Sequence, residues 1–400
     1  MLVEEGLKES LLEGSSIYQV GGQPSHRAEE HVFVLKSIIA KYREEGKLLI
    51  IQSSDLAKFF DKEMIEDAFL TCLKRGANKK ASQLWFKLNE HTRIWVRTGV
   101  GMTQYTNVGA VVGQGTIGGA LVSQAVLDEG VKEHFEPGGE NEMRYGLVPL
   151  APLLFQDDVI NGANGIKEAR IANARMNRVV KQLNLKLNPD KSVCTVIGSN
   201  TQRLSVQREL AANPLMYGEI ETKLKDTFKW LGQMLSSKGL AHSVTETVGA
   251  REGKICGACL EIVQIVNDWR TQAVGGMETA LVLWEGCCIP SLLNGAGNWI
   301  GISTATEKKL NQLQHYFLRL ALQVGPGASL AALSWDVMAL DMGLRVYKEK
   351  ILLVLFIRNL QDNTLAKLIY KEQRLRKWPG LVTETTQICM GLGIRRLQLH

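Results

Sequence analysis

Three aspartates stand where apolar segments of the sequence end. Asp55 closely follows the short branched segment Leu48–Ile51, and the pair Asp157–Asp158 directly follows the apolar segment Tyr145–Phe155. If the two segments are neighbouring strands of one sheet, their ends converge and the carboxylates share a small volume. Clustered carboxylates raise one another's pKa unless cations neutralise them. Oxygen ligands favour Mg²⁺ or Mn²⁺, and two such ions about 3.5–4 Å apart catalyse in-line displacement at phosphorus.

Each of these acidic signals also has a purely structural explanation. An Asp-Asp pair between two apolar segments is commonly a solvated turn. An aspartate at the end of a strand is as often the cap of the following helix as a metal ligand. Taken together and in this order, Asp55 and Asp157–Asp158 support a metal site as strongly as they support purely structural roles.

The elements that must position the aspartates are predicted from hydrophobic periodicity. The sequence predicts helices at 25–46, 62–75, 78–90, 120–135 and 168–183, and strands at 48–51, 145–155, 159–160, 193–197 and 228–235. It also predicts a hairpin within 93–112 and a tight hairpin around the acidic pair. Helical patterns dominate from His242 to the end. The chain is therefore expected to be α+β up to about residue 240, with a domain boundary there.

Composition places the chain among ordinary globular proteins. Its 400 residues are 45% hydrophobic and 22% charged, with 47 Lys+Arg against 41 Asp+Glu. The net charge of +6 permits polyanion binding without indicating it. The odd number of scattered cysteines suggests a reducing compartment, no apolar run reaches the ~20 residues that cross a bilayer, and the acidic N-terminus lacks a secretory pattern. We expect an intracellular protein of the cytoplasm or nucleus, with no membrane partner.

Seven short segments resemble, in order, motifs of the reverse transcriptase domain of non-LTR (LINE-type) retrotransposons. The likeness extends over roughly residues 15 to 360, and the ordered set is far more specific than any member. The segments are YQVGGQPS (18–25, late fingers), DLAKFFD (55–61, first palm motif), GQG (113–115), FQDD (155–158, palm hairpin), LKLNPDKS (185–192), FKWLGQMLSSKG (228–239, primer-grip hairpin) and IPSLLNGAGNW (289–299).

The resemblance implies a right-hand polymerase fold of the α+β class. It assigns partial fingers and a palm with an antiparallel sheet to residues 1–240, a helical thumb to 241–325, and a helical extension to 326–400. The chain is expected to start inside the fingers, so that it is N-terminally truncated. The implied activity is RNA-directed DNA polymerisation, a nucleotidyl transfer that adds dNTPs to a DNA primer 3′-hydroxyl on an RNA template.

The resemblance also assigns catalytic roles to individual residues. Asp55, Asp157 and Asp158 would hold two Mg²⁺ or Mn²⁺ ions, with help from the main-chain carbonyl of Leu56. Lys191 would lie near the pyrophosphate and donate a proton to it. Without the resemblance, Lys191 is equally well explained as an exposed surface lysine.

Substrate contacts are implied in the same way. Phe60 would be the steric gate that excludes a ribose 2′-hydroxyl, and Gln114 with Gly115 would touch the nucleotide or the template. Trp230 and Leu231 would press on the primer terminus. The structural alternatives are a core position for Phe60, Trp230 and Leu231, and an ordinary loop position for Gln114.

Some positions depart from the family pattern. Phe59 stands where the family usually has alanine, and the residues after Gly115 lack the usual proline. Gln156 replaces a small residue, and we expect it to alternate away from the metals on a strand. The fingers hairpin that binds the triphosphate is not found upstream. These departures leave an alternative function open, that of a catalytically inactive retrotransposon relic that at most binds nucleic acid. A purely structural helical scaffold is disfavoured because it leaves the strand-end acids unexplained.

Overall fold

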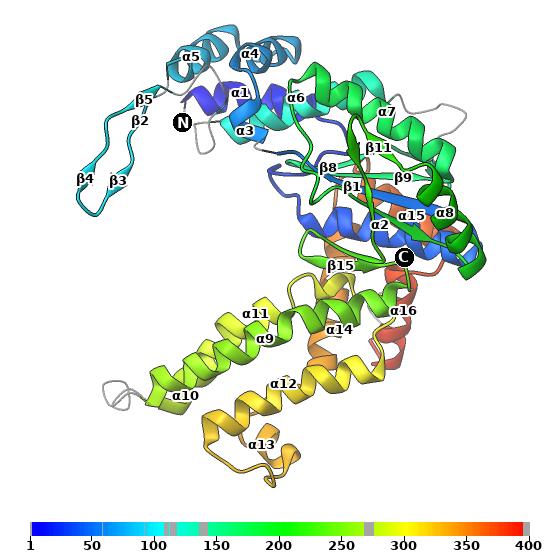
Figure 1. Ribbon diagram of the computed structural model, residues 1–400. Helices are drawn as coiled ribbons and strands as arrows, with labels where there is room; N and C mark the ends of the chain where they lie inside the picture. The colour runs from blue at the N-terminus through cyan, green and yellow to red at the C-terminus, as the bar shows by residue number, and fades with distance from the viewer. Residues whose placement is uncertain are drawn as a thin grey trace. The chain divides into compact units, whose positions relative to one another are not determined.

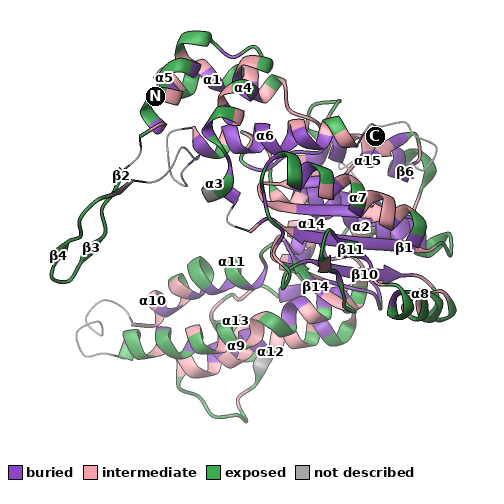
Figure 2. Ribbon diagram, turned by 45° about the horizontal axis from the view of Figure 1, so that its top comes forward, coloured by how far each residue is buried: buried purple, intermediate pink, exposed green. Residues whose placement is uncertain are grey.

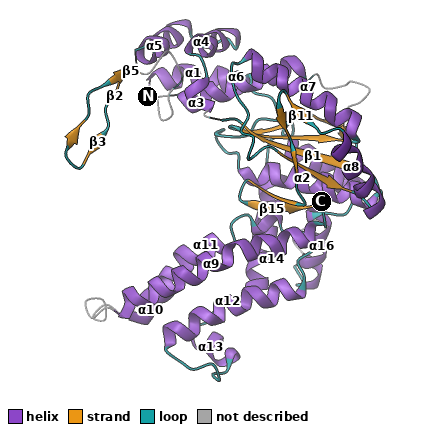
Figure 3. Cartoon of the chain, viewed as in Figure 1, coloured by secondary structure: helices purple, strands orange, loops and turns teal. Residues whose placement is uncertain are grey.

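The computed structural model describes residues 2–57, 59–91, 93–107, 112, 118–135, 143–267 and 276–394 (Figure 1). The chain divides into two compact units. The first contains residues 1–31, 45–225 and 363–368, and the second contains 32–44, 226–362 and 369–400. Strands gather in the first unit, and the second is mostly helical, as Figure 3 shows. The predicted change from α+β to mainly helical structure is confirmed.

A five-stranded sheet in the order β13-β10-β1-β9-β8 forms the centre of the first unit. Its strands are β1 (Leu49–Asp55), β8 (Leu153–Phe155), β9 (Asp158–Ala163), β10 (Val193–Ile197) and β13 (Lys223–Leu224). The central strand β1 pairs antiparallel with both β9 and β10, whereas β13 runs parallel to β10. Every residue of β1 before Asp55 is buried. The strand predicted at 48–51 therefore exists and continues to the aspartate itself.

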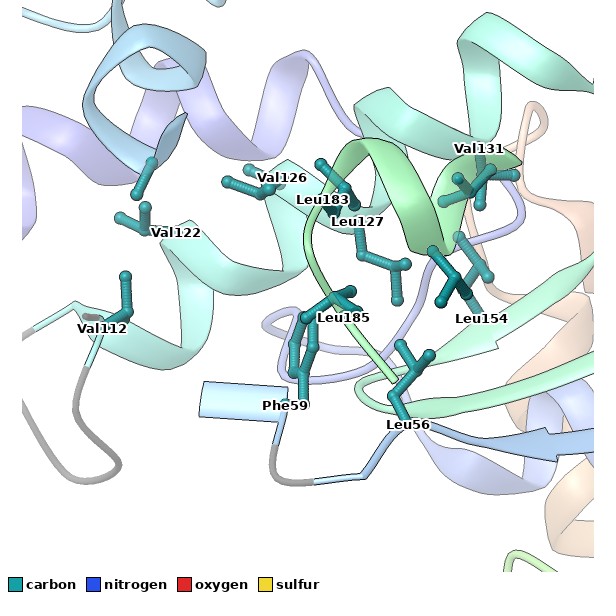
Figure 4. Close-up of a cluster of buried hydrophobic side chains, with 14 of the residues drawn as sticks. Leu56, Phe59, Val112, Val122, Val126, Leu127, Val131, Leu154, Leu183 and Leu185 are labelled. Atoms are coloured by element: carbon teal, nitrogen blue, oxygen red, sulfur yellow. The ribbon is translucent and has the colours of Figure 1, made fainter. Parts of the chain in front are cut away.

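The first unit also contains helices. They are α1 (Leu2–Glu13), α3 (Phe59–Lys62), α4 (Ile65–Lys74), α5 (Lys79–Asn89), α6 (Gly119–His134), α7 (Ile166–Gln182) and α8 (Asn200–Ala212). Buried side chains of α6, including Val122, Val126 and Leu127, lie in one cluster with Leu56 and Leu185 (Figure 4). Burial of such side chains stabilises a fold by roughly 1.5–3 kcal/mol each. The residue that follows Asp55 is thus fixed in the core.

Short two-stranded sheets complete the first unit. The pairs are β2 (Arg93–Ile94) with β5 (Thr106–Asn107), β3 (Arg97–Thr98) with β4 (Gly101–Met102), β6 (Met143–Tyr145) with β7 (Val148–Leu150), and β11 (Met216–Tyr217) with β12 (Ile220–Glu221). The hairpin predicted within 93–112 is confirmed over 93–107. The single strand predicted at 145–155 is wrong, because the chain reverses at Gly146, whose φ is +63°, and forms three short strands.

The second unit combines one hairpin with many helices. The hairpin joins β14 (Thr227–Trp230) to β15 (Gln233–Ser236), and most of α2 (Ala28–Glu44) belongs to this unit. The other elements are α9 (Leu240–Asn267), α10 (Gly276–Leu283), the π-helix η2 (Trp284–Cys288), α11 (Ile289–Leu292), the 3₁₀ helix η3 (Ala296–Asn298), α12 (Thr304–Leu322), α13 (Leu330–Asp336), α14 (Met342–Arg358), most of α15 (Leu365–Arg376), and α16 (Leu381–Gly391).

Two expectations about this unit change with the structure. The single strand that periodicity predicts at 228–235 is wrong, because the chain turns at Leu231 and Gly232, both with positive φ. The hairpin that the resemblance implies for this segment is observed instead. The units divide between 225 and 226 rather than near 240. Residues 241–325 and 326–400 both fall mainly in the second unit, and their assignment to a thumb and an extension stays a prediction. No helix in the described ranges is both long and apolar enough to span a membrane.

Candidate active site

Asp55 and Asp158 lie directly opposite each other in the β1–β9 pairing. Directly opposed residues of an antiparallel pair point to the same face of the sheet, about 4.5–5.5 Å apart at Cβ. Asp157 occupies the turn before Asp158, and its carbonyl accepts the Leu56 N–H at 3.3 Å. The structure therefore brings the three predicted aspartates to one end of the sheet, although they are distant in sequence.

The acidic hairpin turns on Gln156 and Asp157, between Phe155 and Asp158. Gln156 has a φ of +56°, a value that is uncommon for residues other than Gly, Asn and Asp. The tight hairpin predicted here is confirmed. The expectation that Gln156 alternates along a strand is wrong, because it is the first residue of the turn, and Asp158 already belongs to β9.

A segment near the N-terminus holds this hairpin. The Leu154 N–H donates to the Tyr18 carbonyl at 2.8 Å, and Gln19 forms a parallel bridge with Leu154. The buried His31 Nε2 lies 2.9 Å from the Tyr18 carbonyl and 3.0 Å from the Leu154 carbonyl, so it donates to both. Burial lowers the pKa of His31 to about 4. A neutral histidine therefore links the two segments at physiological pH.

Asn188 is the residue of the site that sequence reasoning missed. Its backbone N–H donates to the Asp55 carbonyl at 2.8 Å, and its Nδ2 donates to Asp55 Oδ2 at 3.1 Å. The preceding residues run beside the end of β1, since the Ala57 N–H donates to the Lys186 carbonyl at 2.7 Å. Two sequence features could have indicated that Asn188 positions Asp55. They are the alternation of apolar and polar residues in LKLN and the proline that follows Asn188.

Lys191 makes an ion pair with Asp55. Its Nζ lies 3.0 Å from Asp55 Oδ1, and 65% of its side chain is exposed against 14% for Asp55. The hydrogen bond to Asp55 raises the pKa of Lys191 above its usual value. Both carboxylate oxygens of Asp55 are thus engaged, one by an amide and one by an ammonium group.

The pKa values of the other two aspartates are raised. Burial, followed by the charges of Asp157 and Asp55, raises the pKa of Asp158 to about 6. The pKa of Asp157 is also raised, mainly by burial. A partly buried carboxylate with a raised pKa fits a site for a hard divalent ion, which would stabilise its ionised form.

The side-chain arrangement itself is not that of a loaded metal site. Among the described residues, no group of three or more His, Cys, Asp or Glu side chains is arranged to hold a metal ion. Asp55 is turned toward Asn188 and Lys191. The carboxylate oxygens and the backbone positions of the three aspartates fit a divalent ion. In this structure the ammonium group of Lys191 is the cation that contacts Asp55.

The remaining predicted residues have varied surroundings. Phe60 in α3 is partly buried and packs on the core cluster, with its ring centroid 5.4 Å from that of Phe59. Leu56 has a buried side chain, and its backbone pairs with Leu187. Gln114 and Gly115 lie outside the described residues.

Trp230 and Leu231 belong to the second unit. Trp230 is buried, with 2% of its surface exposed. Leu231 has a φ of +43° and precedes Gly232 at +77°, which is the pattern of a type I′ hairpin turn. A contact of either residue with a primer stays a prediction.

The two motif segments of the second unit pack on each other. Arg251 donates to the carbonyls of Gly232 at 2.7 Å and Asn294 at 2.9 Å. Gln233 Nε2 donates to the Asn294 carbonyl at 2.8 Å, and Trp299 Nε1 donates to Gln233 Oε1 at 2.9 Å. The β14–β15 turn is therefore anchored on the IPSLLNGAGNW segment, a relation that the sequence did not reveal.

Comparisons with known proteins give little further identification. No family model matches the chain, and no curated protein matches it. Similar solved structures include apo telomerase from Candida tropicalis, with 10% identity and a TM-score of 0.44 over 93% of this chain and 55% of that chain. Telomerase from Candida albicans in complex with a TWJ fragment of telomeric RNA has 10% identity and a TM-score of 0.39, over 93% and 57%. The chain spans a little over half the length of these proteins. Because the TM-scores are below 0.5, the interpretation of the site depends on its own geometry.

Proposed function

We propose that this chain is an RNA-directed DNA polymerase, a reverse transcriptase of non-LTR retrotransposon origin. It adds deoxynucleotides to the 3′-hydroxyl of a DNA primer on an RNA template. The observation that carries the proposal is the direct pairing of Asp55 with Asp158, with Asp157 in the adjoining turn. The order of the seven motif segments supports the choice of this polymerase family.

Asp55, Asp157 and Asp158 would hold two Mg²⁺ or Mn²⁺ ions, with the main-chain carbonyl of Leu56 as a further ligand. When bound, such ions neutralise phosphate charge and favour ionisation of the attacking hydroxyl. The chain's own contribution is to hold the carboxylates ready. The raised pKa of Asp158 favours cation binding, since a cation stabilises the ionised form that burial disfavours.

Lys191 acts as a mobile cation in this proposal. Its ammonium pairs with Asp55, and it would leave that ion pair when Asp55 holds a divalent ion instead. The freed ammonium then reaches the pyrophosphate and donates a proton to it as it leaves. The exposed side chain leaves room for this movement, and positioning together with charge stabilisation accounts for most of the catalysis in phosphoryl transfer.

The remaining roles concern the substrates. Phe60 follows Asp55 by five positions, and its partly buried ring would limit the space for a ribose 2′-hydroxyl. Gln114 and Gly115 would contact the nucleotide or the template. Trp230 and Leu231 would support the primer terminus through the β14–β15 turn.

Primer extension on an RNA template tests the proposal. With oligo(dT) on poly(rA), the wild-type chain should incorporate dTTP, and Asp157→Ala should lose on the order of 10²–10⁴-fold in rate. Asp336→Ala removes an exposed carboxylate of α13 and is the matched control, with unchanged incorporation. An Asp157→Ala variant as active as the control would remove this aspartate from the mechanism.

A second candidate is a catalytically inactive protein of the same ancestry that binds nucleic acid. The observation in its favour is that both carboxylate oxygens of Asp55 are occupied by the chain's own groups. It is supported if the wild-type chain binds primer–template with a steep salt dependence and yet incorporates no nucleotide with Mg²⁺ or Mn²⁺.

A further inference from the structure

The hairpin Arg93–Asn107, here called the arm, projects from the helices of the first unit (Figure 1). Every residue from 93 to 105 is exposed, and Figure 2 shows the β3–β4 end of the arm in the colour of exposed residues. A two-stranded hairpin is marginally stable on its own. Large apolar side chains on such a solvent-exposed hairpin therefore suggest that the hairpin binds another molecule.

An aromatic and cationic cluster lies on one face of the arm. The ring centroids of Trp95 and Tyr105 are 6.1 Å apart, and the guanidinium of Arg93 lies 4.7 Å from the Tyr105 centroid. The two rings keep 52% and 51% of their surface exposed. The pairing of Arg93 with Asn107 and of Ile94 with Thr106 places Trp95 opposite Tyr105. The rings are thus held next to each other but open to a ligand.

The charge of the arm has one sign. No Asp or Glu occurs from His91 to Leu127, and the arm carries Arg93 and Arg97. Arg93 is the first residue of β2 and Arg97 is the first residue of β3, so one cation lies on each side of Trp95 along the chain.

We propose that the arm binds single-stranded nucleic acid. Trp95 and Tyr105 offer their faces to unpaired bases, while Arg93 and Arg97 pair with phosphates. Proteins that bind single strands without sequence preference combine these two features, since every base has a face for stacking. The absence of carboxylates removes the repulsion that a polyanion would otherwise meet. Because both faces of the two-stranded arm are exposed, its rings can stack with bases, whereas the arm forms no groove for a folded partner.

The contact requires no catalysis and goes beyond the proposed polymerase activity. Stacking and phosphate pairing do not read the ribose 2′-hydroxyl, which is the group that distinguishes RNA from DNA. Oligomers of rU and dT with equal length should therefore bind the arm with similar affinity.

Fluorescence anisotropy with labelled 20-mers of rU and dT, in EDTA and without nucleotide, tests the proposal. The Trp95→Ala/Tyr105→Ala variant should bind about 5- to 150-fold more weakly for each base that loses its stacking partner. Trp95→Phe/Tyr105→Phe keeps both rings and should bind nearly as well as the wild type. Trp335→Ala removes an aromatic ring that is 84% exposed in the second unit and is the matched control, with unchanged affinity.

Salt dependence measures the phosphate contacts separately. Replacing both arginines, as Arg93→Gln/Arg97→Gln, should reduce the slope of log K against log salt by about 1.4, since each phosphate contact of a single strand contributes ~0.7. Arg208→Gln, on the exposed face of α8, should leave the slope unchanged.

Two outcomes would overturn the proposal. One is a folded alanine double variant, judged by circular dichroism, that binds both oligomers like Trp335→Ala. The other is a wild-type dimer in sedimentation that the double variant dissociates while oligomer affinity stays unchanged, because the arm would then join two copies of the chain. Asp157→Ala is expected to keep oligomer binding, so failure of the polymerase proposal and failure of this one are distinguishable.

Discussion

Asn188 holds Asp55 twice, through its backbone N–H to the carbonyl at 2.8 Å and through its side-chain amide to Oδ2 at 3.1 Å. The amide fixes the direction of a carboxylate at the end of the central strand. The amide donates a hydrogen bond to that carboxylate without adding charge, whereas Lys191 brings a positive charge to the other oxygen. The orientation of Asp55 therefore depends on a residue that is distant in the sequence.

We predict that Asn188→Ala lowers the free energy of unfolding by about 1 kcal/mol, the usual net value of one hydrogen bond. Asn188→Asp should cost more, and more at pH 8 than at pH 5, because it places a second carboxylate against Asp55. Urea unfolding at both pH values measures these differences. Equal losses for the two variants at both pH values would mean that the amide does not hold the carboxylate.

Asp158 should give the fold a defined pH dependence. Its pKa is about 6 in the folded state against 3.8 ordinarily, so between these values the folded chain keeps a proton that the unfolded chain has lost. This contribution to stability is present below pH ~4 and is lost as the pH rises through ~6.

The asparagine of the Asp158→Asn variant cannot ionise, so the variant should not lose this contribution to stability as the pH rises through ~6. Relative to the wild type, the variant should gain about 1–3 kcal/mol of stability between pH 4 and pH 7, after allowance for partial exposure. Urea unfolding in EDTA across this range measures the difference. Asp336→Asn is the control and should follow the wild-type profile. A constant difference between Asp158→Asn and wild type would place the pKa of Asp158 near its ordinary value.

Lys191 should compete with divalent cations for Asp55. Because its ammonium occupies Oδ1, Lys191→Ala is predicted to bind Mg²⁺ or Mn²⁺ more tightly than the wild type, by a few-fold, and to extend primers more slowly. Isothermal titration calorimetry measures the affinity, and Lys191→Arg, which keeps the charge, should resemble the wild type. Weaker metal binding by Lys191→Ala would show that the lysine supports the ion site rather than competing for it.

Gly21 should tolerate no side chain. A Cβ at this position would lie 2.6 Å from the backbone nitrogen of Gln156, in the turn of the acidic hairpin. Gly21→Ala is therefore predicted to cost about 1–3 kcal/mol and to weaken metal binding at the site. Gly249→Ala meets open space in α9 and should instead stabilise the chain by about 0.5–1 kcal/mol. Thermal unfolding of both variants tests the opposite signs.

Periodicity identified the main elements of the first unit because their apolar patterns are regular. The strand predicted at 193–197 matches β10, and the juxtaposition of Asp55 with the acidic pair followed from two buried strands in one sheet. Periodicity missed the turn at Leu231, which only the resemblance to a primer-grip hairpin implied. A leucine continues an apolar run and is not a residue that usually marks a turn with positive φ. Gly146 was missed for a similar reason, as a single glycine inside an apolar segment.

The details of the site depended on contacts that no local pattern encodes. Asn188 and Asp55 are distant in sequence, and an Asn-Pro pair on its own indicates only a turn. The ion pair of Lys191 with Asp55 depends on side-chain directions, which spacing does not determine. The α1 and α8 helices were not predicted, and the roles of Gln114 and Gly115 remain predictions because they lie outside the described residues.

The bridge between Gln19 and Leu154 has a consequence for how the chain avoids self-association. β8 is the last strand of its sheet, and the unpaired backbone of an outermost strand invites pairing with another molecule. The Tyr18–Val20 stretch covers part of that border. Chains shortened past residue 22 would lose this cover together with the grip on the acidic turn, and they should precipitate or form fibrils more readily than the intact protein.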